Sequence, residues 1–324
     1  MVAPLNEPTF QEVLEGPTDL IALVLAKCRQ LGTNEAAKYF DVSQVAVRNW
    51  LALRSVPGIQ HAQRILTDNP NATVAQPSIP EDLGDWEGRK ILIATAAYSH
   101  VEPGHHLSLI AAMRNFGHDK VGYTQIEATL IDESRGALLR RFVKSQTATD
   151  MIMVDDDMLL PCGVPALMQK YGCTLPEPYL SMNFISRLMS HPRDTGIIGA
   201  TYVGRHVHGK IQCSAGFESS LEDKYIRDHP DKGLKKVGWV ATGCIRITRE
   251  VAEKMLAEAP TKFPDTITKD GPNVFSKAAG MGEDVAFCRR AEKLGISSFI
   301  DTSLIAGHIG KQTFWPSNTT WRQS

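Results

Sequence analysis

The spacing of apolar residues divides the chain into two parts with different patterns. Up to residue 67, short apolar runs recur with the spacing of amphipathic helices. After residue 88, buried-type apolar runs alternate with longer amphipathic segments, as in strands connected by helices. Residues 67–88 are rich in Pro, Asn, Gly and Asp and show no apolar period. We therefore predict a helical domain over 1–68, a linker over 69–88 and a larger domain over 89–324.

The first part contains helix start and stop signals at short intervals. Thr33 and Ser43 are suitable N-caps, and Gly32 is a suitable helix terminus. These signals predict helices over 18–32, 33–40, 43–53 and 57–66.

The middle two of these helices resemble a helix-turn-helix of the Cro-like or MerR-like kind. Ala37 stands at the small position of the first helix, and the apolar anchors are Phe40, Val42, Val47 and Trp50. Asp41 replaces the usual glycine of the turn, and aspartate tolerates the left-handed conformation better than most residues.

This resemblance implies DNA contact by the second helix, through the exposed residues Ser43, Gln44, Arg48 and Asn49. Gln and Asn can pair with an adenine edge, and Arg can bind guanine or phosphate. Residues 18–66 contain six basic and three acidic side chains, a modest net charge of +3. A helical bundle that binds protein or dimerises is the alternative.

The second part begins with a regular alternation of elements. The pattern predicts strands over 89–98, 119–127 and 150–154, and helices over 103–117 and 130–145. Such alternation is typical of an α/β fold with a mostly parallel sheet. Ligands of these folds bind beyond the carboxyl ends of the strands.

Three consecutive aspartates, Asp155 to Asp157, follow the third predicted strand. In an extended segment, Asp155 and Asp157 would face one side and Asp156 the other. Carboxylate oxygens suit Mg²⁺ or Mn²⁺, which bridge diphosphate oxygens, and three neighbouring carboxylates without a cation would repel one another. An acidic loop at a sheet edge is the alternative.

The order of segments over residues 89–310 resembles a GT-A glycosyltransferase, a Rossmann-like, nucleotide-sugar-dependent enzyme with a DxD motif. The matching segments are ILIATAAY (91–98), LIDESRGALLRRFV (130–143), MIMVDDDM (151–158), GWVATGCIRITREVAEKM (238–255), GMGEDVAFCRRAEKLGI (280–296) and IDTSLIAGHIG (300–310).

The resemblance implies a role for each matching residue. The donor, expected to be a UDP-sugar, would be bound by Thr95, Ala96, Arg135, Asp155, Asp156 and Lys311. Gly136 stands where the family usually has Asn. Asp157 and His308 would bind Mn²⁺ or Mg²⁺. If the reaction inverts the anomeric carbon, Asp284 is the expected base and Glu283 would hold the acceptor hydroxyl. The two acids also suit the start of a helix.

The acceptor is suggested by the helical part. A DNA-reading module fused to a glycosyltransferase predicts DNA as the acceptor, at a hydroxymethylated pyrimidine, and small catalytic domains of this type resemble those of bacteriophages. Reaching such a base requires flipping or single-stranded DNA. A phage structural protein as acceptor, or a DNA-binding regulator that senses a nucleotide sugar, are the alternatives.

Composition excludes several classes of function. The 324 residues have a formal net charge of −1, so no global field attracts nucleic acid or an anionic membrane. Neither a signal peptide nor a transmembrane helix is expected, and the six cysteines form no CxxC pair, so we expect a cytoplasmic protein. We expect His105 and His106 to be solvated at a helix start, and His206 and His208 to share an exposed strand face.

Overall fold

The computed structural model describes residues 20–52, 61, 64–65, 68, 88–97, 102–114, 116, 120–127, 130–173, 175, 179–202, 215–216, 233–310 and 313–314. The α-helices are α2 (Leu20–Phe40), α3 (Gln44–Leu51), α5 (Pro103–Met113), α6 (Ile131–Ser145), α7 (Pro165–Lys170), α8 (Phe184–Met189), α9 (Arg249–Lys262) and α10 (Glu283–Lys293), and the 3₁₀ turns are η1 (Arg193–Thr195) and η2 (Pro264–Thr266). None of these helices has the length and hydrophobicity that crossing a bilayer requires.

The strands form one large sheet and several small ones. In chain order they are β1 (Ile91–Ala97), β2 (Val121–Glu127), β3 (Asp150–Asp155), β4 (Met158–Leu159), β5 (Ile197–Thr201), β6 (Ala215–Gly216), β7 (Leu234–Val237), β8 (Trp239–Val240), β9 (Cys244–Thr248), β10 (Ile267–Thr268), β11 (Gly271–Pro272), β12 (Ser298–Ile305), β13 (Gly307–Ile309) and β14 (Thr313–Phe314). Among the described residues the large sheet has seven strands, in the order β2-β1-β3-β9-β5-β12-β7.

The large sheet is mostly parallel. Strands β2, β1 and β3 are parallel neighbours, and β12 runs parallel to β5. Strand β9 is antiparallel to both β3 and β5, and β7 is antiparallel to β12. Consequently β2, β1, β3, β5 and β12 all end at the same edge, which confirms the predicted α/β class and sheet type.

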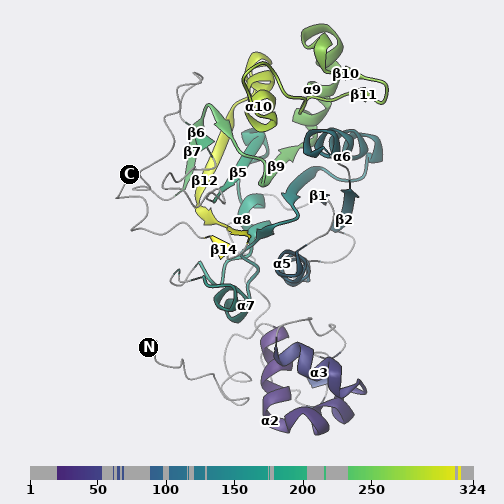
Figure 1. Ribbon diagram of the computed structural model, residues 1–324, viewed down its shortest axis with the longest axis vertical. Coiled ribbons are helices and arrows are strands. Elements are labelled where there is room, and N and C mark those ends of the chain that lie inside the picture. The colour runs from purple at the N-terminus through teal and green to yellow at the C-terminus, as the bar shows by residue number, and fades with distance from the viewer. Residues whose placement is uncertain are drawn as a thin grey trace.

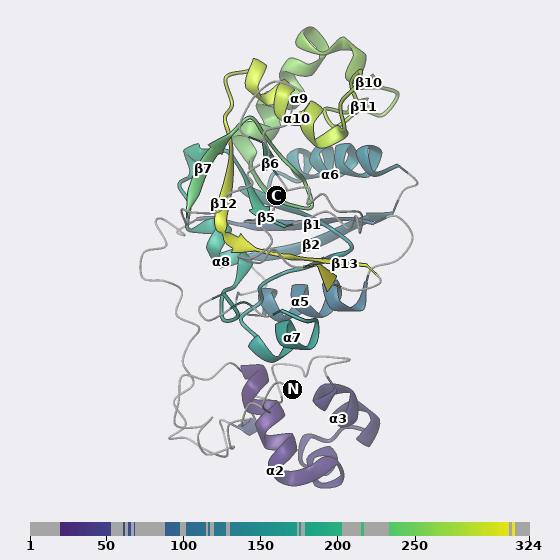
Figure 2. The ribbon, with the colours of Figure 1, turned by 60° about the vertical axis from the view of Figure 1, so that its left-hand side comes forward.

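Helices cover both faces of this sheet (Figures 1 and 2). Helices α6, α9 and α10 lie on one face, and α5, α7 and α8 lie on the other. Side chains of β3 alternate between the two layers, because Ile152 and Val154 join one core cluster while Met151 and Met153 join the other. The sheet therefore lies between two hydrophobic layers that fix the position of its carboxyl-end edge.

The predicted α/β elements match the structure closely in position. Strands predicted over 89–98, 119–127 and 150–154 correspond to β1, β2 and β3. The helix predicted over 103–117 ends at Met113, and Gly117 lies outside the described residues.

The helical part contains α2 and α3. Gly32, with φ 73° and ψ 164°, is non-helical, so the two helices predicted over 18–32 and 33–40 meet at a kink within one element. Asp41 has φ 54°, which is the left-handed conformation expected at this turn. The predicted anchors are in the core: Ala37, Phe40, Val47 and Trp50 are buried, and Val42 packs against them. A DNA-binding role for these helices stays a prediction.

The helical part lies beside α7 (Figures 1 and 2). Lys170, the last residue of α7, donates a hydrogen bond from Nζ to the carbonyl of Ala52, 2.5 Å away, just after α3. Of the predicted linker, only residue 88 is among the described residues, so the division into domains stays a prediction.

Candidate active site

The acidic residues gather where the parallel strands end. Asp155 is the last residue of β3 and pairs in register with Ala96 of β1. Its N–H donates to the carbonyl of Gly243, 3.0 Å away, immediately before β9 begins. The antiparallel strand β9 thus brings the segment 241–243 to the same edge as the end of β3.

Arg135 connects two of the predicted acids. Its Nη2 donates to both carboxylate oxygens of Asp155 at 2.8 Å, and its Nη1 donates to Glu283 Oε1 at 2.8 Å. Although burial acts to lower the pKa of Arg135, the carboxylates of Asp155 and Glu283 raise it above its ordinary value. The guanidinium of Arg135 on α6 therefore joins the end of β3 to the start of α10, although Arg135 and Glu283 are 148 positions apart in the chain.

The chain turns directly after Asp155, so the expectation of an extended aspartate segment was wrong. Asp156 and Asp157 form a turn, and β4 follows at once. The turn is required because β4 leaves the large sheet and pairs with β13 in a small one. Burial, together with the nearby charge of Asp157, raises the pKa of Asp155, so the two carboxylates are electrostatic neighbours.

Asp157 lies against His308, as a shared metal site requires. Asp157 Oδ2 and His308 Nε2 are 3.4 Å apart. Two ligand atoms each about 2.1 Å from one ion would be separated by about 3.0 to 3.4 Å, depending on the coordination angle. A carboxylate and an imidazole at this separation fit one Mn²⁺ or Mg²⁺ ion. The described residues contain no group of three or more His, Cys, Asp or Glu suited to a metal ion.

Glu283 and Asp284 open helix α10. Gly282 is the N-cap, and both acids lie in the first turn, where negative charge is favourable. The N–H of Val285 donates to Asp284 Oδ1 at 2.8 Å. Burial, followed by the charge of Glu283, raises the pKa of Asp284, which makes its carboxylate a better proton acceptor.

Tyr202 belongs to this site, and sequence reasoning missed it. It follows β5 at the same edge, its ring meets the His308 ring edge-on with centroids 5.7 Å apart, and its hydroxyl accepts from the N–H of Gly243 at 2.9 Å. Burial raises its pKa well above the ordinary value, with Asp155 and Asp284 adding to the effect. Its place after a strand of the parallel set was the available signal.

A buried nitrogen and a buried hydroxyl oxygen at this edge have no hydrogen-bond partner among the described residues. These are Arg135 Nε and the hydroxyl oxygen of Thr242, which lies in the turn before β9. Buried polar groups normally have partners, and an unpaired one calls for an explanation such as a catalytic role or a bound water or ion. The site thus has unused hydrogen-bonding capacity on both the α6 side and the β9 side.

The two residues of β1 that were predicted to bind the sugar donor, Thr95 and Ala96, are fully buried. Thr95 Oγ1 lies 3.5 Å from His105 Nε2. His105 is also fully buried, so the expectation that it is solvated was wrong, while His106 is exposed as expected. Burial lowers the pKa of His105 to about 4, and its imidazole is neutral at pH 7.

Asp156 and Lys311 were also predicted to bind the donor, and His206 and His208 were predicted on an exposed strand face. Asp156 is half-buried in the turn, and its carbonyl accepts from the N–H of Glu102 at 3.1 Å. Lys311, His206 and His208 lie outside the described residues.

The predicted DNA-contacting residues lie on α3 or next to it. Ser43, Gln44 and Arg48 are exposed, and Asn49 is half-buried. The Ser43 hydroxyl is the N-cap and accepts from the N–H of Ala46 at 3.1 Å. Val45 is 57% exposed, and sequence reasoning did not single it out.

Comparison with known proteins gives little. No protein-family model and no curated protein matches the chain. One solved structure is described as the crystal structure of A197 from STIV. Its alignment with this protein covers 71% of this chain and 91% of the A197 chain, with 15% sequence identity and a TM-score of 0.44. A similarity at this TM-score supports no conclusion about activity.

Proposed function

We propose that the chain is a metal-dependent glycosyltransferase that uses a nucleotide-sugar donor. The observation that supports this most is the cluster at the end of β3. Arg135 contacts both Asp155 and Glu283, and Asp157 Oδ2 lies 3.4 Å from His308 Nε2. All five were selected from their resemblance to GT-A enzymes, and they come from distant segments of the chain.

The chain's residues divide the work of binding the donor. Asp157 and His308 would hold Mn²⁺ or Mg²⁺, with diphosphate oxygens of the donor completing the coordination. The ion would stabilise the negative charge that develops on the leaving nucleoside diphosphate. Arg135 Nη2 donates to both carboxylate oxygens of Asp155 and so fixes this carboxylate, which would accept from a ribose hydroxyl of the donor.

In the transfer step, the acceptor oxygen forms a bond to the anomeric carbon as the bond from that carbon to the diphosphate oxygen breaks. The diphosphate leaves with the bonding electron pair, and the acceptor's proton passes to Asp284. A raised pKa suits Asp284 to this task, and Glu283 beside it is positioned by Arg135 to hold the acceptor. This arrangement inverts the anomeric carbon.

Donor turnover tests the proposal directly. Wild type with a UDP-sugar and Mn²⁺ should release UDP, EDTA should stop the release, and Asp157→Asn should slow it by at least about 100-fold. Asp284→Asn should retain UDP binding and lose transfer. Asp270→Asn, an exposed aspartate of the β10–β11 hairpin, is the matched control and should behave as wild type. If Asp157→Asn in EDTA releases UDP as fast as wild type does with Mn²⁺, metal-dependent catalysis at this site is refuted.

We further propose that the acceptor is DNA. The exposed face of α3 presents Gln44, Val45 and Arg48, which combine an amide, an apolar group and a cation. Amides pair with adenine, apolar groups contact the thymine methyl, and arginine binds guanine or phosphate.

A DNA titration distinguishes this acceptor from a protein. Wild type should bind labelled duplex or single-stranded DNA with an affinity that falls steeply as salt rises. Arg48→Ala should weaken binding and lower transfer to long DNA while leaving UDP-sugar hydrolysis unchanged. Arg141→Ala, on exposed α6 surface, is the control. If wild type shows no salt-sensitive DNA binding, a protein acceptor becomes the better hypothesis.

A further inference from the structure

Helix α5 and its N-cap residue contact every second residue from Asp156 to Leu160, the segment that contains part of the acidic turn. Three residues spaced three apart, Glu102, His105 and Ser108, make the contacts. The N–H of Glu102 donates to the carbonyl of Asp156 at 3.1 Å, His105 Nδ1 lies 2.9 Å from the carbonyl of Met158, and Ser108 Oγ accepts from the N–H of Leu160 at 3.3 Å.

This regularity has a geometric cause. His105 and Ser108 lie three apart and therefore on the same face of α5, and alternate residues of the segment that follows the turn, Met158 and Leu160, face the same way. One helix face can therefore contact one edge of the segment from residue 158 to residue 160, while the N-cap residue Glu102 holds the turn through the carbonyl of Asp156.

The opposite edge of the same segment is held by β13. The N–H of Ile309 donates to the carbonyl of Asp157 at 2.7 Å. Strand β13 also pairs with β4, with Gly307 opposite Leu159 and His308 opposite Met158. The segment is thus fixed between α5 and β13, and Met158 connects the two sides because it contacts His105 and pairs with His308.

His105 is the side chain that fixes Met158. A carbonyl oxygen only accepts, so Nδ1 of His105 carries the proton, and Nε2 is left to accept from Thr95 Oγ1 at 3.5 Å. The imidazole is fully buried, so water does not compete for either contact. Its Nδ1–H therefore sets the orientation of the peptide group one residue after Asp157.

We propose that His105 is a positioning residue that sets the distance and direction of Asp157 relative to His308. This inference rests on the proposed function, because it assumes that the pair binds a metal ion. His105 itself touches neither metal nor donor. Residues that orient metal ligands from outside typically change metal affinity by about 10- to 100-fold when they are removed.

Two substitutions separate the hydrogen bond from the volume of the ring. Asn Nδ2 is as many bonds from Cα as His Nδ1, so His105→Asn keeps a donor for Met158. His105→Leu keeps apolar bulk and removes the donor. His106→Leu is the control, because His106 is the exposed neighbour on the same helix.

Titration with Mn²⁺ alone is the first measurement. We expect His105→Leu to weaken Mn²⁺ binding at least about tenfold and to raise the Mn²⁺ concentration for half-maximal UDP release by the same factor. The turnover number at saturating Mn²⁺ should change far less. His105→Asn should bind Mn²⁺ close to wild type, and so should His106→Leu. Equal Mn²⁺ affinity in His105→Leu and wild type would overturn the proposal.

Hydrogen exchange of backbone amides tests the positioning role without any metal. In His105→Leu, the amides of Leu160 and Ile309 should exchange about five to ten times faster, because Leu160 itself lies on the loosened segment and Ile309 donates to the carbonyl of Asp157 on it. The exchange should stay at the wild-type rate in His106→Leu. If wild type neither binds Mn²⁺ nor releases UDP, the proposed function fails, and unchanged exchange in His105→Leu separately overturns the positioning role.

If His105→Leu does not fold, a second pair of variants tests the proposal. In His105→Gln the amide nitrogen lies one bond further from Cα than Nδ1, so it cannot replace that donor in place. His105→Asn should then bind Mn²⁺ more tightly than His105→Gln, with both variants folded by circular dichroism. Equal affinities in the two would overturn the proposal.

Discussion

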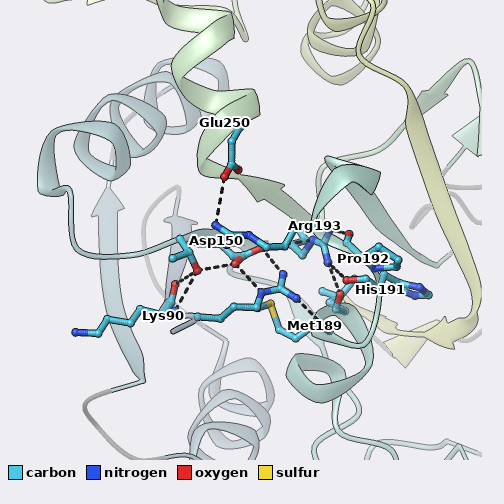
Figure 3. Close-up of polar contacts among 11 residues, drawn as sticks. Lys90, Asp150, Met189, His191, Pro192, Arg193 and Glu250 are labelled. Atoms are coloured by element: carbon cyan, nitrogen blue, oxygen red, sulfur yellow. Dashed lines mark hydrogen bonds and ion pairs between the residues drawn. The ribbon is translucent and has the colours of Figure 1, made fainter. Parts of the chain in front are cut away.

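Strand β3 begins and ends with an aspartate, and the two ends differ in how many positive and negative side chains surround that aspartate. Asp150, at the start, accepts from Arg89 Nε at 3.1 Å and Nη2 at 2.7 Å, and Arg246 Nε lies 3.8 Å away. Figure 3 shows this network around Asp150. All three side chains are almost completely buried. Two cations thus serve one carboxylate at this end.

Backbone carbonyl groups accept hydrogen bonds from the two arginines and so offset the extra positive charge at the Asp150 end. Arg89 Nη1 donates to the carbonyl of Met189 at 3.0 Å. Arg246 donates to the carbonyls of Leu188, His191 and Pro192 at 2.8 to 2.9 Å. These carbonyls lie at and after the C-terminal end of α8, where the helix dipole favours cations. Burial still lowers the pKa of Arg246 to about 10.

At the Asp155 end, carboxylates outnumber guanidinium groups. One guanidinium, Arg135, contacts both Asp155 and Glu283, and the carboxylates of Asp157 and Asp284 lie nearby. The side chains of Asp155 and Glu283 are 21% and 20% exposed, so ligands can reach them. Breaking a buried ion-pair network such as the one at Asp150 is costly, whereas accessible carboxylates whose pKa values are raised are candidates for a functional site.

The largest predicted difference between the two ends is in stability. Asp150→Ala leaves two buried guanidinium groups without their carboxylate and should lower the free energy of unfolding by about 3 to 5 kcal/mol. Asp157→Ala removes one of several neighbouring like charges and should change it by less than about 1 kcal/mol. Urea unfolding of both variants at pH 7 measures the difference. Similar losses in the two variants would show that the ends are not distinct.

Acid titration provides a second, slightly smaller difference. The pKa of His105 is lowered by burial to about 4 in the folded protein, against about 6.5 unfolded, so the unfolded chain binds a proton first. Stability from this group is complete above pH 6.5 and should fall by up to about 3 kcal/mol as pH drops to 4. Unfolding curves of wild type and His105→Asn across this range should differ in slope. Parallel curves would mean that His105 does not titrate as a buried group.

The contrast between the two ends also explains what the sequence predicts and what it hides. Asp155 and Asp157 stand out because three aspartates after an apolar strand are unusual and match a known motif. Asp150 and Arg246 carry no such signal, because each is a single charge at the border of or inside an apolar run. Arg89 contacts Asp150 across 61 positions of the chain, and no local pattern encodes such a contact.

Local patterns also failed where a second sheet competes for the chain. The aspartate segment was expected to continue the extended conformation of the strand before it, with Asp155 and Asp157 facing one side. The structure bends it instead, since Met158 and Leu159 pair with β13 outside the large sheet. Tyr202 was missed for a related reason, because it becomes part of the site only when β5 is placed beside β9. Element positions were therefore predictable, and the pairing between distant elements was not.

The smallest predicted effect concerns the residue next to Arg135. Gly136 lies inside α6, and a Cβ there would be 2.3 Å from Asn273 Oδ1, which accepts from the N–H of Phe275 at 3.2 Å. Alanine gains about 1 kcal/mol over glycine in a helix, and the overpacking costs about 1 to 3 kcal/mol. Gly136→Ala should therefore lower the free energy of unfolding by up to about 2 kcal/mol.

A double-mutant cycle isolates this contact. Asn273→Ala removes the clashing oxygen, so Gly136→Ala should cost far less, or become stabilising, in that background. Gly122→Ala on β2 is the control, because its nearest atoms are 3.9 and 4.0 Å from the added Cβ. Because α6 carries Arg135 to the Asp155 end, Gly136→Ala should also weaken UDP binding, while Gly122→Ala should not. If Gly136→Ala costs the same with and without the Asn273 side chain, the tight approach of these two residues does not limit the position of α6.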